Sequence, residues 1–192
     1  MIKTIVWDVD DVLNDLMRRW LEDEWLPGHP GCGVGYAELR ENPPCGVLGC
    51  SLDQYLASLD RYRLRSAGML EPAPEIVEWF SAQGGRFRHV ALTATPAVAA
   101  SISAGWVMQH FGSWIRSYSF VPSPRNYNPV PAYDGTKEDY LRWWGKGDLL
   151  IDDNPQHLEG ARRIGMRGLL VPRPWNDASG TLASVLAELS TL

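Results

Sequence analysis

Apolar runs and segments with helical character alternate along most of the chain. Short runs rich in Ile, Val, Leu and Trp predict buried strands at residues 3–8, 88–93, 117–121, 148–153 and 168–171. Between and after them, helices are expected at residues 75–82, 96–111, 136–144, 155–164 and 180–189. Strands that alternate with helices predict an α/β fold in which a parallel sheet carries helices on both faces.

One stretch, residues 15–71, has no strong strand signal. Apolar residues spaced three and four apart predict a first helix from Val12 to Leu21, and a cluster of Pro and Gly ends the pattern at residues 26–31. Residues 27–51 are rich in Gly, Pro and Cys, and a second helix is expected from Leu52 to Tyr62 with Ser51 as its N-cap. The sequence therefore predicts a core of residues 1–14 and 72–192 with an α-rich insertion, 15–71, after the first strand.

Composition limits the kind of protein. A chain of 192 residues with 45% hydrophobic and 21% charged residues is typical of one globular core plus a small module. A net charge of −5 offers no electrostatic surface for nucleic acid, so no nucleic-acid partner is expected. No apolar run approaches the ~20 residues of a membrane span, and no signal-peptide pattern precedes the first strand. We expect a cytoplasmic protein without a membrane partner, either a monomer or a homodimer.

Three cysteines lie in the insertion: Cys32, Cys45 and Cys50, close to His29. A zinc site with three Cys ligands and one His is one interpretation, and three reduced thiols are the other. No Cys-x-x-Cys pair is present and the spacing matches no common zinc finger. The sequence leaves both interpretations open.

Carboxylates follow two of the predicted strands. Asp8 and Asp10 come at the end of the first strand, and Asp152 and Asp153 at the end of the fourth. The carboxyl ends of parallel strands share one edge of the sheet, where α/β folds place ligands. Four acids at one edge raise one another's pKa unless a cation compensates them. Mg²⁺, which binds carboxylates together with substrate phosphate oxygens, is the cofactor that this pattern predicts.

Other groups at that edge suit an anionic substrate. Thr93 ends the second strand with a hydroxyl, and the N–H groups of the following turn, beginning at Ala94, can face an anion. Lys137 is the best placed of the three lysines to neutralise a transferring group. Arg125, in the long loop 122–135, is either a phosphate or sugar contact or a surface arginine.

Four motifs occur in order along the chain. They are Asp-Val-Asp-Asp-Val-Leu at residues 8–13, Thr93 after Val-Ala-Leu, Lys137 in Gly-Thr-Lys-Glu-Asp-Tyr-Leu, and Leu-Leu-Ile-Asp-Asp-Asn at residues 149–154. This ordered set resembles the haloacid-dehalogenase-like (HAD-like) superfamily of aspartate-nucleophile phosphohydrolases. The resemblance implies a Rossmannoid three-layer α/β/α core with a small cap inserted after the first strand. Within the superfamily the chain looks most like the 5′(3′)-deoxyribonucleotidase-like group, in its small helical insertion, its Leu-Ile-Asp-Asp motif and its Arg-Pro-Trp-Asn segment at residues 173–176. It departs from the usual pattern at Asp11, which stands where Gly is usual.

The resemblance also implies roles for the residues. Asp8 would attack phosphorus and form an aspartyl-phosphate, and Asp10 would act as the general acid and then the general base. Thr93 and Lys137 would bind the phosphoryl oxygens.

The metal ligands implied are Asp8, the Asp10 carbonyl and Asp152. Asp153 would be either a direct or water-mediated ligand, or only the N-cap of the helix that starts at Pro155. The implied activity is Mg²⁺-dependent hydrolysis of a small phosphorylated metabolite, with a nucleoside or deoxynucleoside monophosphate as the first candidate.

Two alternatives belong to other classes. The chain could be a catalytically silent binding or regulatory protein, or a dehalogenase built on the same core. Trp20, Trp25 and Tyr36 of the insertion could stack on a substrate, but packing in an apolar core is the commoner fate. Trp143 is expected on a core-facing helix surface, and His157 is expected to be structural.

Overall fold

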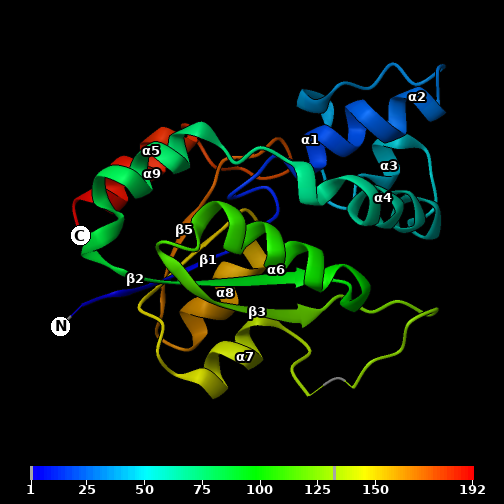
Figure 1. Cartoon of the computed structure of the whole chain (residues 1–192). Coiled ribbons are helices and arrows are strands. Elements are labelled where there is room, and N and C mark those ends of the chain that lie inside the picture. Colours follow the sequence, from blue (N-terminus) through cyan, green and yellow to red (C-terminus); the bar gives the residue numbers. More distant parts are fainter. Residues whose placement is uncertain (1, 132) are drawn as a thin grey trace.

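A five-stranded parallel sheet forms the centre of the molecule, seen in a computed structural model that describes residues 2–131 and 133–192 (Figure 1). The strands are β1 (Thr4–Trp7), β2 (Arg88–Thr95), β3 (Ile115–Pro122), β4 (Leu149–Asp152) and β5 (Arg167–Leu170). Their order across the sheet is β3-β2-β1-β4-β5, and each neighbouring pair is parallel. The predicted α/β class with a parallel sheet is confirmed.

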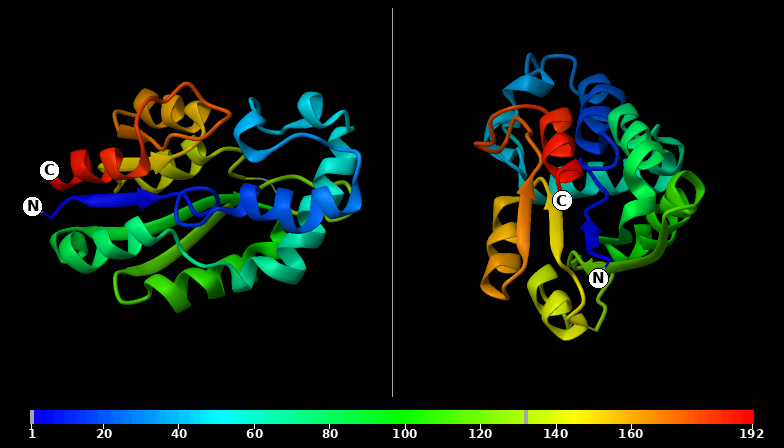
Figure 2. Two further views of the ribbon diagram at one scale, coloured as in Figure 1. Left: turned by 90° about the horizontal axis from the view of Figure 1, so that it is seen from above. Right: turned by 90° about the vertical axis from the view of Figure 1, so that its left-hand side faces the viewer.

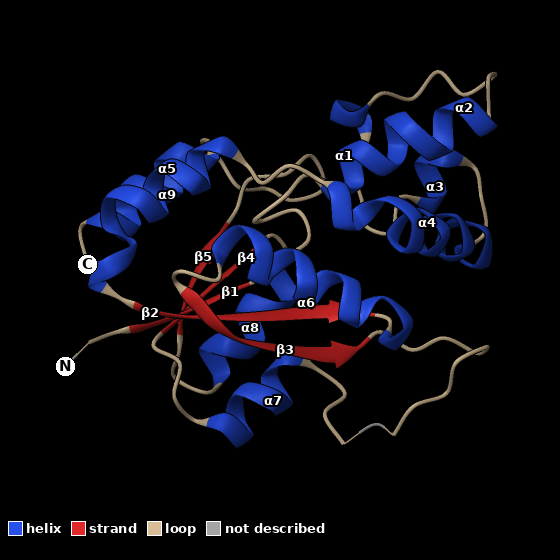
Figure 3. Cartoon of the chain, in the orientation of Figure 1, coloured by secondary structure: helices blue, strands red, loops and turns tan. Residues whose placement is uncertain are grey.

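Helices cover both faces of this sheet (Figure 3). One face packs against α5 (Pro74–Gln83), α6 (Ala97–Phe111) and α9 (Leu182–Ser190), and the other against α7 (Lys137–Trp144) and α8 (Pro155–Arg163). Strand β1 contributes Ile5 and Trp7 to the first apolar cluster and Val6 to the second. Since both faces of β1 are buried, its sequence is a continuous apolar run rather than an alternating one.

Residues 15–71, which we name the cap segment, lie beyond the carboxyl ends of the strands, while both termini lie at the opposite end (Figures 1 and 2). The segment contains α1 (Leu16–Trp20), a π-helical turn (Leu21–Trp25), α2 (Leu26–Gly28), α3 (Cys45–Leu48) and α4 (Leu52–Ser66), with 3-10 turns at Tyr36–Glu38 and Ala67–Met69. Its buried residues form an apolar cluster of their own around Trp20, Tyr55 and Leu59. The division into a core and an inserted domain stays a prediction.

Several local predictions differ from the structure. The first helix begins at Leu16 rather than Val12, because Val12 and Leu13 lie in a turn and fill the core beside the sheet. Helix α4 continues four residues past Tyr62, to Ser66. The placement of Trp143 in the core is wrong, since the residue is 74% exposed.

Trp20 and Trp25 pack in the apolar cluster of the cap segment, as the commoner fate of such residues suggested. The zinc interpretation gains no support. Over residues 2–131 and 133–192, the group of ligand-type side chains close enough to share a metal is Asp8, Asp152 and His157, without the cysteines. No helix in this part of the chain is long and apolar enough to cross a bilayer.

A buried histidine links β1 to its neighbour. The Trp7 Nε1–H group lies 3.0 Å from His89 Nδ1, and His89 Nε2 lies 2.8 Å from the Gly84 carbonyl oxygen. The ring therefore accepts at Nδ1 and donates at Nε2, which is the neutral form. Burial lowers the pKa of His89 below its usual value.

The free energy of unfolding should therefore depend on pH through His89. As the pH falls below about 6.5, the unfolded state binds a proton at His89 before the folded state does, and stability is lost down to the lower folded pKa. We expect wild type to lose more stability than His89→Asn on going from about pH 7.5 to pH 5.5, measured by urea unfolding. A difference in free energy of unfolding between wild type and His89→Asn that does not change with pH would contradict this account.

Candidate active site

The carboxyl end of β1 holds a buried group of three charges. The Asp8 backbone N–H donates to the Ile151 carbonyl at 2.9 Å, which fixes the chain just beyond β1 against β4. Lys137 Nζ then lies 2.9 Å from Asp8 Oδ1 and 2.7 Å from Asp152 Oδ2. All three side chains are buried. We name Asp8, Lys137 and Asp152 the charge triad.

The triad carries two negative charges and one positive charge, and the pKa values reflect this imbalance. Burial raises the pKa of Asp8 to about 6, with Lys137 opposing the shift and Asp152 adding to it. Burial would also raise the pKa of Asp152, but Lys137 and His157 lower it to about 2. The two carboxylates raise the pKa of Lys137 against the effect of its burial. Lys137 and Asp152 are therefore a firmly ionised pair, and Asp8 keeps the uncompensated charge.

The loop after β4 surrounds Asp152 and Asp153 with further hydrogen-bond partners. The Asn154 backbone N–H donates to Asp152 Oδ1 at 2.9 Å, and His157 Nδ1 lies 3.1 Å from both Asp152 oxygens. Trp175 Nε1 donates to Asp153 Oδ2 at 2.7 Å, and burial beside other acids raises the Asp153 pKa well above its ordinary value. The N-cap of α8 is Asn154, whose side chain accepts from the Gln156 N–H, so the alternative that Asp153 caps this helix is wrong.

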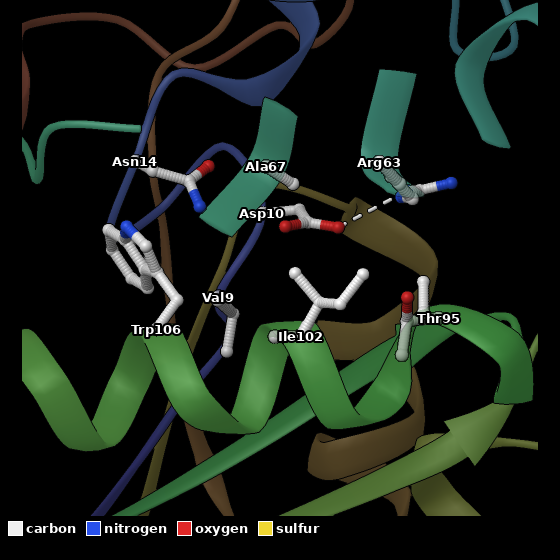
Figure 4. Close-up of a pocket in the computed structure, with 10 residues that line it drawn as sticks. Val9, Asp10, Asn14, Arg63, Ala67, Thr95, Ile102 and Trp106 are labelled. Carbon is white, nitrogen blue, oxygen red and sulfur yellow. Dashed lines mark hydrogen bonds and ion pairs between the residues drawn. The ribbon is translucent and has the colours of Figure 1, made fainter. Parts of the chain in front are cut away.

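Asp10 belongs to a different set of contacts. Its carboxylate is paired with Arg63 of α4, whose Nη2 lies 3.1 Å from Asp10 Oδ2 (Figure 4). The two acids of the first motif are thus separated: Asp8 pairs with a lysine of the core and Asp10 with an arginine of the cap segment.

The turn between these acids and α1 has a strained residue. Asp11 has φ of 61°, in the left-handed region that favours glycine, which explains why the related motif usually has Gly there. Asp11 Oδ1 accepts from the Met17 N–H at 2.9 Å, and Arg173 Nε donates to the Asp11 carbonyl at 2.6 Å. These contacts hold the turn that carries Asp10.

A cavity of about 440 Å³ opens over Asp8 and Asp10, and we name it the main cavity. Thr93 and Ala94, at the end of β2, line it beside Asp153 and His157. The cap segment supplies the apolar wall, made of Leu16, Met17, Pro43, Leu52, Tyr55, Leu56 and Leu59. Lys137 lies beneath this cavity and lines a neighbouring one of about 370 Å³, so it reaches the main cavity through Asp8.

Arg125 also lines the main cavity, but its guanidinium forms an ion pair with Asp60. Its Nε and Nη2 donate to the two carboxylate oxygens of Asp60 at 2.5 and 3.0 Å. The surface-arginine alternative is wrong, because Arg125 is only 8% exposed. Contact between Arg125 and a substrate would require that Asp60 release it.

No protein-family model matches the chain, and no curated protein is similar to it in sequence. Solved structures are similar in fold. A haloacid dehalogenase-like family hydrolase from Streptococcus pneumoniae has 15% identity and a TM-score of 0.59, over 96% of this chain and 90% of that one. The chain has the HAD-like hydrolase fold.

Two further structures show what this fold hosts. CbbY from Rhodobacter sphaeroides, solved with phosphate, has 15% identity and a TM-score of 0.53, over 96% of each chain. A 2-haloacid dehalogenase from Pseudomonas syringae has 16% identity and a TM-score of 0.50, over 98% of this chain and all of that one. One fold thus accompanies different chemistries, and the reaction depends on the residues of the site rather than on the fold.

Within this HAD-like fold, the donor set fits a hard divalent cation. Asp8 and Asp152 place carboxylate oxygens within 4.8 Å of each other and of a His157 nitrogen. With Asp153 there are three buried acids beside one lysine, so the local charge is negative and the donors are mainly oxygens. Oxygen donors with excess negative charge suit Mg²⁺. The Asp10 side chain is paired with Arg63 through Oδ2, and the family resemblance implies the Asp10 carbonyl oxygen as the ligand from that residue.

Three contributors were missed from the sequence. His157 was assigned a structural role, yet it contacts Asp152 and lines the cavity. Trp175 binds Asp153 from a loop far along the chain, and no local pattern reveals such a contact. Arg63 could have been found, because it falls on the helical stripe of Leu52, Leu56 and Leu59 that faces the cavity.

Removing the lysine of the triad should destabilise the fold. Lys137→Met leaves Asp8 and Asp152 buried without their cation, which lowers the free energy of unfolding by about 3–5 kcal/mol. Lys146→Met, at an exposed position before β4, should change it by less than about 0.5 kcal/mol. Urea unfolding measures both. The double variant Lys137→Met with Asp152→Asn should recover part of the loss, and equal stability of Lys137→Met and wild type would refute the buried triad.

Proposed function

We propose that this protein is a phosphomonoester hydrolase that forms an aspartyl-phosphate at Asp8 and uses Mg²⁺. The observation that carries the proposal is the separation of the two acids of the first motif. Asp8, which is paired with Lys137, lines the cavity floor, and Asp10, which is paired with Arg63, lines its wall. One carboxylate is thereby available as a nucleophile and the other for proton transfer.

The proposed reaction has two steps. In the first, an Asp8 oxygen attacks phosphorus, the bond from phosphorus to the ester oxygen breaks, and Asp10 protonates the leaving oxygen. In the second, Asp10 takes a proton from water as that water attacks phosphorus, and the bond from phosphorus to Asp8 breaks. Thr93 and the backbone N–H groups near Ala94 bind phosphoryl oxygens, and Lys137 keeps Asp8 in place.

Asp8, Asp152 and the Asp10 carbonyl would hold Mg²⁺, with Asp153 as a further partner. When bound, the ion supplies positive charge that offsets the negative charge of the phosphoryl group and of the acids. The protein's own groups position the ester and exclude water, because the cap segment forms one whole wall of the cavity.

A small phosphorylated metabolite fits the cavity. About 440 Å³ is within the range of small-molecule sites, and its polar floor faces an apolar wall that includes the ring of Tyr55. A phosphate group suits the floor, and a flat or apolar group suits the wall. Nucleoside and deoxynucleoside monophosphates are our first candidates. A phosphate-release screen over nucleotides, sugar phosphates and amino-acid phosphates with Mg²⁺ tests this choice.

Substitution of the two acids should separate their roles. Asp8→Asn should lower phosphate release from p-nitrophenyl phosphate by at least about 10⁴-fold, because the nucleophile is lost. Asp10→Asn should lower it by about 10²–10⁴-fold, the range for general acid–base catalysis. Asp53→Asn, at an exposed position on α4, is the control and should keep wild-type activity. Phosphate release that survives in Asp8→Asn would rule out this nucleophile.

Removal of metal gives an independent test. Chelation should abolish phosphate release and added Mg²⁺ should restore it. Mg²⁺ at 100 times its Kd should also stabilise the folded wild type by about 2.7 kcal/mol, and Asp152→Asn should lose this stabilisation. Thermal unfolding with and without Mg²⁺ measures it. Phosphate release that continues undiminished in chelator would contradict the metal assignment. So would a Mg²⁺-induced rise in the unfolding temperature of Asp152→Asn that equals the rise in wild type.

The same assays address the other two classes. Halide release from a 2-haloacid, without phosphate release from any ester, would favour a dehalogenase. Binding of phosphate esters with no turnover would favour a silent regulatory protein. The presence of Asp10 favours a phosphatase, since dehalogenation does not need this acid.

A further inference from the structure

An ion-pair network joins the cap segment to two loops of the core. Arg63 of α4 contacts Asp10, on the loop after β1, with Nη2 at 3.1 Å from Oδ2. Asp60, one turn earlier on the same helix, binds Arg125 on the loop after β3 and accepts from the Tyr127 hydroxyl at 2.7 Å. The two cap residues therefore bind core loops that follow different strands.

The network is continuous through α4. Arg63 Nη1 lies 3.4 Å from Asp60 Oδ1, so the guanidinium bridges Asp60 and Asp10. The side chain of Arg63 is 11% exposed and those of Asp60 and Arg125 are 5% exposed. Two aspartates and two arginines give a net charge of zero. Since every charge in this buried group has an opposite partner, the arrangement avoids the cost of an isolated buried charge.

The surroundings of Asp10 limit where its side chain can go. The chain turns at Asp11, directly after Asp10, and Arg173 Nε holds this turn by donating to the Asp11 carbonyl oxygen. Behind Asp10, toward Trp106 and Ser103 of α6, lies a space of about 10 Å³, room for about one water molecule (Figure 4). On its open side Asp10 lines the main cavity, with 20% of the side chain exposed.

We propose that Arg63 is a positioning residue for Asp10. It holds the Asp10 carboxylate through Oδ2 beside the main cavity, while Asp60, itself bound by Arg125, holds Arg63. Asp10 is then oriented for proton transfer only while α4 is docked on the core. Docking of the cap segment and orientation of the Asp10 carboxylate therefore occur together. This inference rests on the proposed role of Asp10 and goes beyond it, because it names what orients the acid.

The test combines kinetics with hydrogen exchange on the full chain. With p-nitrophenyl phosphate and Mg²⁺, Arg63→Met should lower kcat by about 10- to 100-fold and change KM by less than about threefold. The loss is smaller than the full rate contribution of acid–base catalysis, about 10²–10⁴-fold, because Asp10 itself is still present. Arg63→Lys, which keeps the charge but loses the planar fork that bridges two carboxylates, should fall between wild type and Arg63→Met. Methylguanidinium in solution should restore part of the activity of Arg63→Met.

The matched control is Arg65→Met. Arg65 lies two residues further along α4, is 61% exposed and pairs with Glu24 inside the cap segment. This variant should keep wild-type kcat and KM. In hydrogen exchange, Arg63→Met and Asp60→Asn should speed exchange in α4 and in the loop 8–14, whereas Arg65→Met should not. Hydrogen exchange needs no turnover and reports on docking directly.

Each result bears on a separate claim. If wild type shows no hydrolysis of any ester, the proposed function fails, while faster exchange in Arg63→Met alone still supports the docking network. If wild type is active and Arg63→Met keeps kcat within about twofold, the positioning inference is overturned and the proposed function stands. A rise in KM with unchanged kcat would make Arg63 a substrate contact and also overturn it. Equal exchange in Arg63→Met and Arg65→Met would overturn it whatever the activity.

Discussion

The buried contact of Lys137 with Asp8 and Asp152 is the interaction on which the rest of the site depends. One ammonium group lies between the carboxylate of Asp8, just beyond β1, and that of Asp152, at the end of β4. It therefore ties the ends of β1 and β4 together and holds Asp8 at the cavity floor. A buried ion pair of this kind adds little net stability, and an apolar replacement of the whole group can be as stable. In the proposed mechanism its value lies in chemistry: it keeps the Asp8 carboxylate in one place and leaves part of its charge uncompensated.

The fold creates this contact through strand order. Because β1 lies between β2 and β4, the carboxyl ends of three neighbouring strands bring Asp8, Thr93 and Asp152 to one edge of the sheet. The cap segment then covers that edge with the stripe of α4 that contains Leu56 and Leu59. The core thus supplies the groups that we propose for phosphate chemistry. The cap segment supplies the apolar wall of the cavity and, through Arg63, a contact to the second acid.

The sequence predicted those features that have a local cause. Buried strands are visible as apolar runs, and the acids that follow them are visible as breaks in those runs, so the parallel sheet and the set of Asp8, Thr93 and Asp152 could be placed. The sequence predicted a helix start at Val12, because Val12 and Leu13 have helical spacing. Both residues lie in a turn, and their burial comes from tertiary packing. Contacts between distant segments, such as Trp175 with Asp153 and Arg125 with Asp60, have no local signal. Trp143 shows the reverse error, since a large apolar residue in a helix can still face solvent.

The central claim is that Asp8 carries the phosphoryl group during turnover. The most direct measurement is acid quenching during turnover of a phosphate ester, followed by digestion at low pH and mass spectrometry of the peptide that contains residue 8. Asp10→Asn, in which breakdown of the intermediate is slow, gives the most sensitive sample. The account predicts a phosphoryl adduct on Asp8 in that variant and none in Asp8→Asn. Phosphate release by wild type with no adduct on Asp8 in either protein would contradict it.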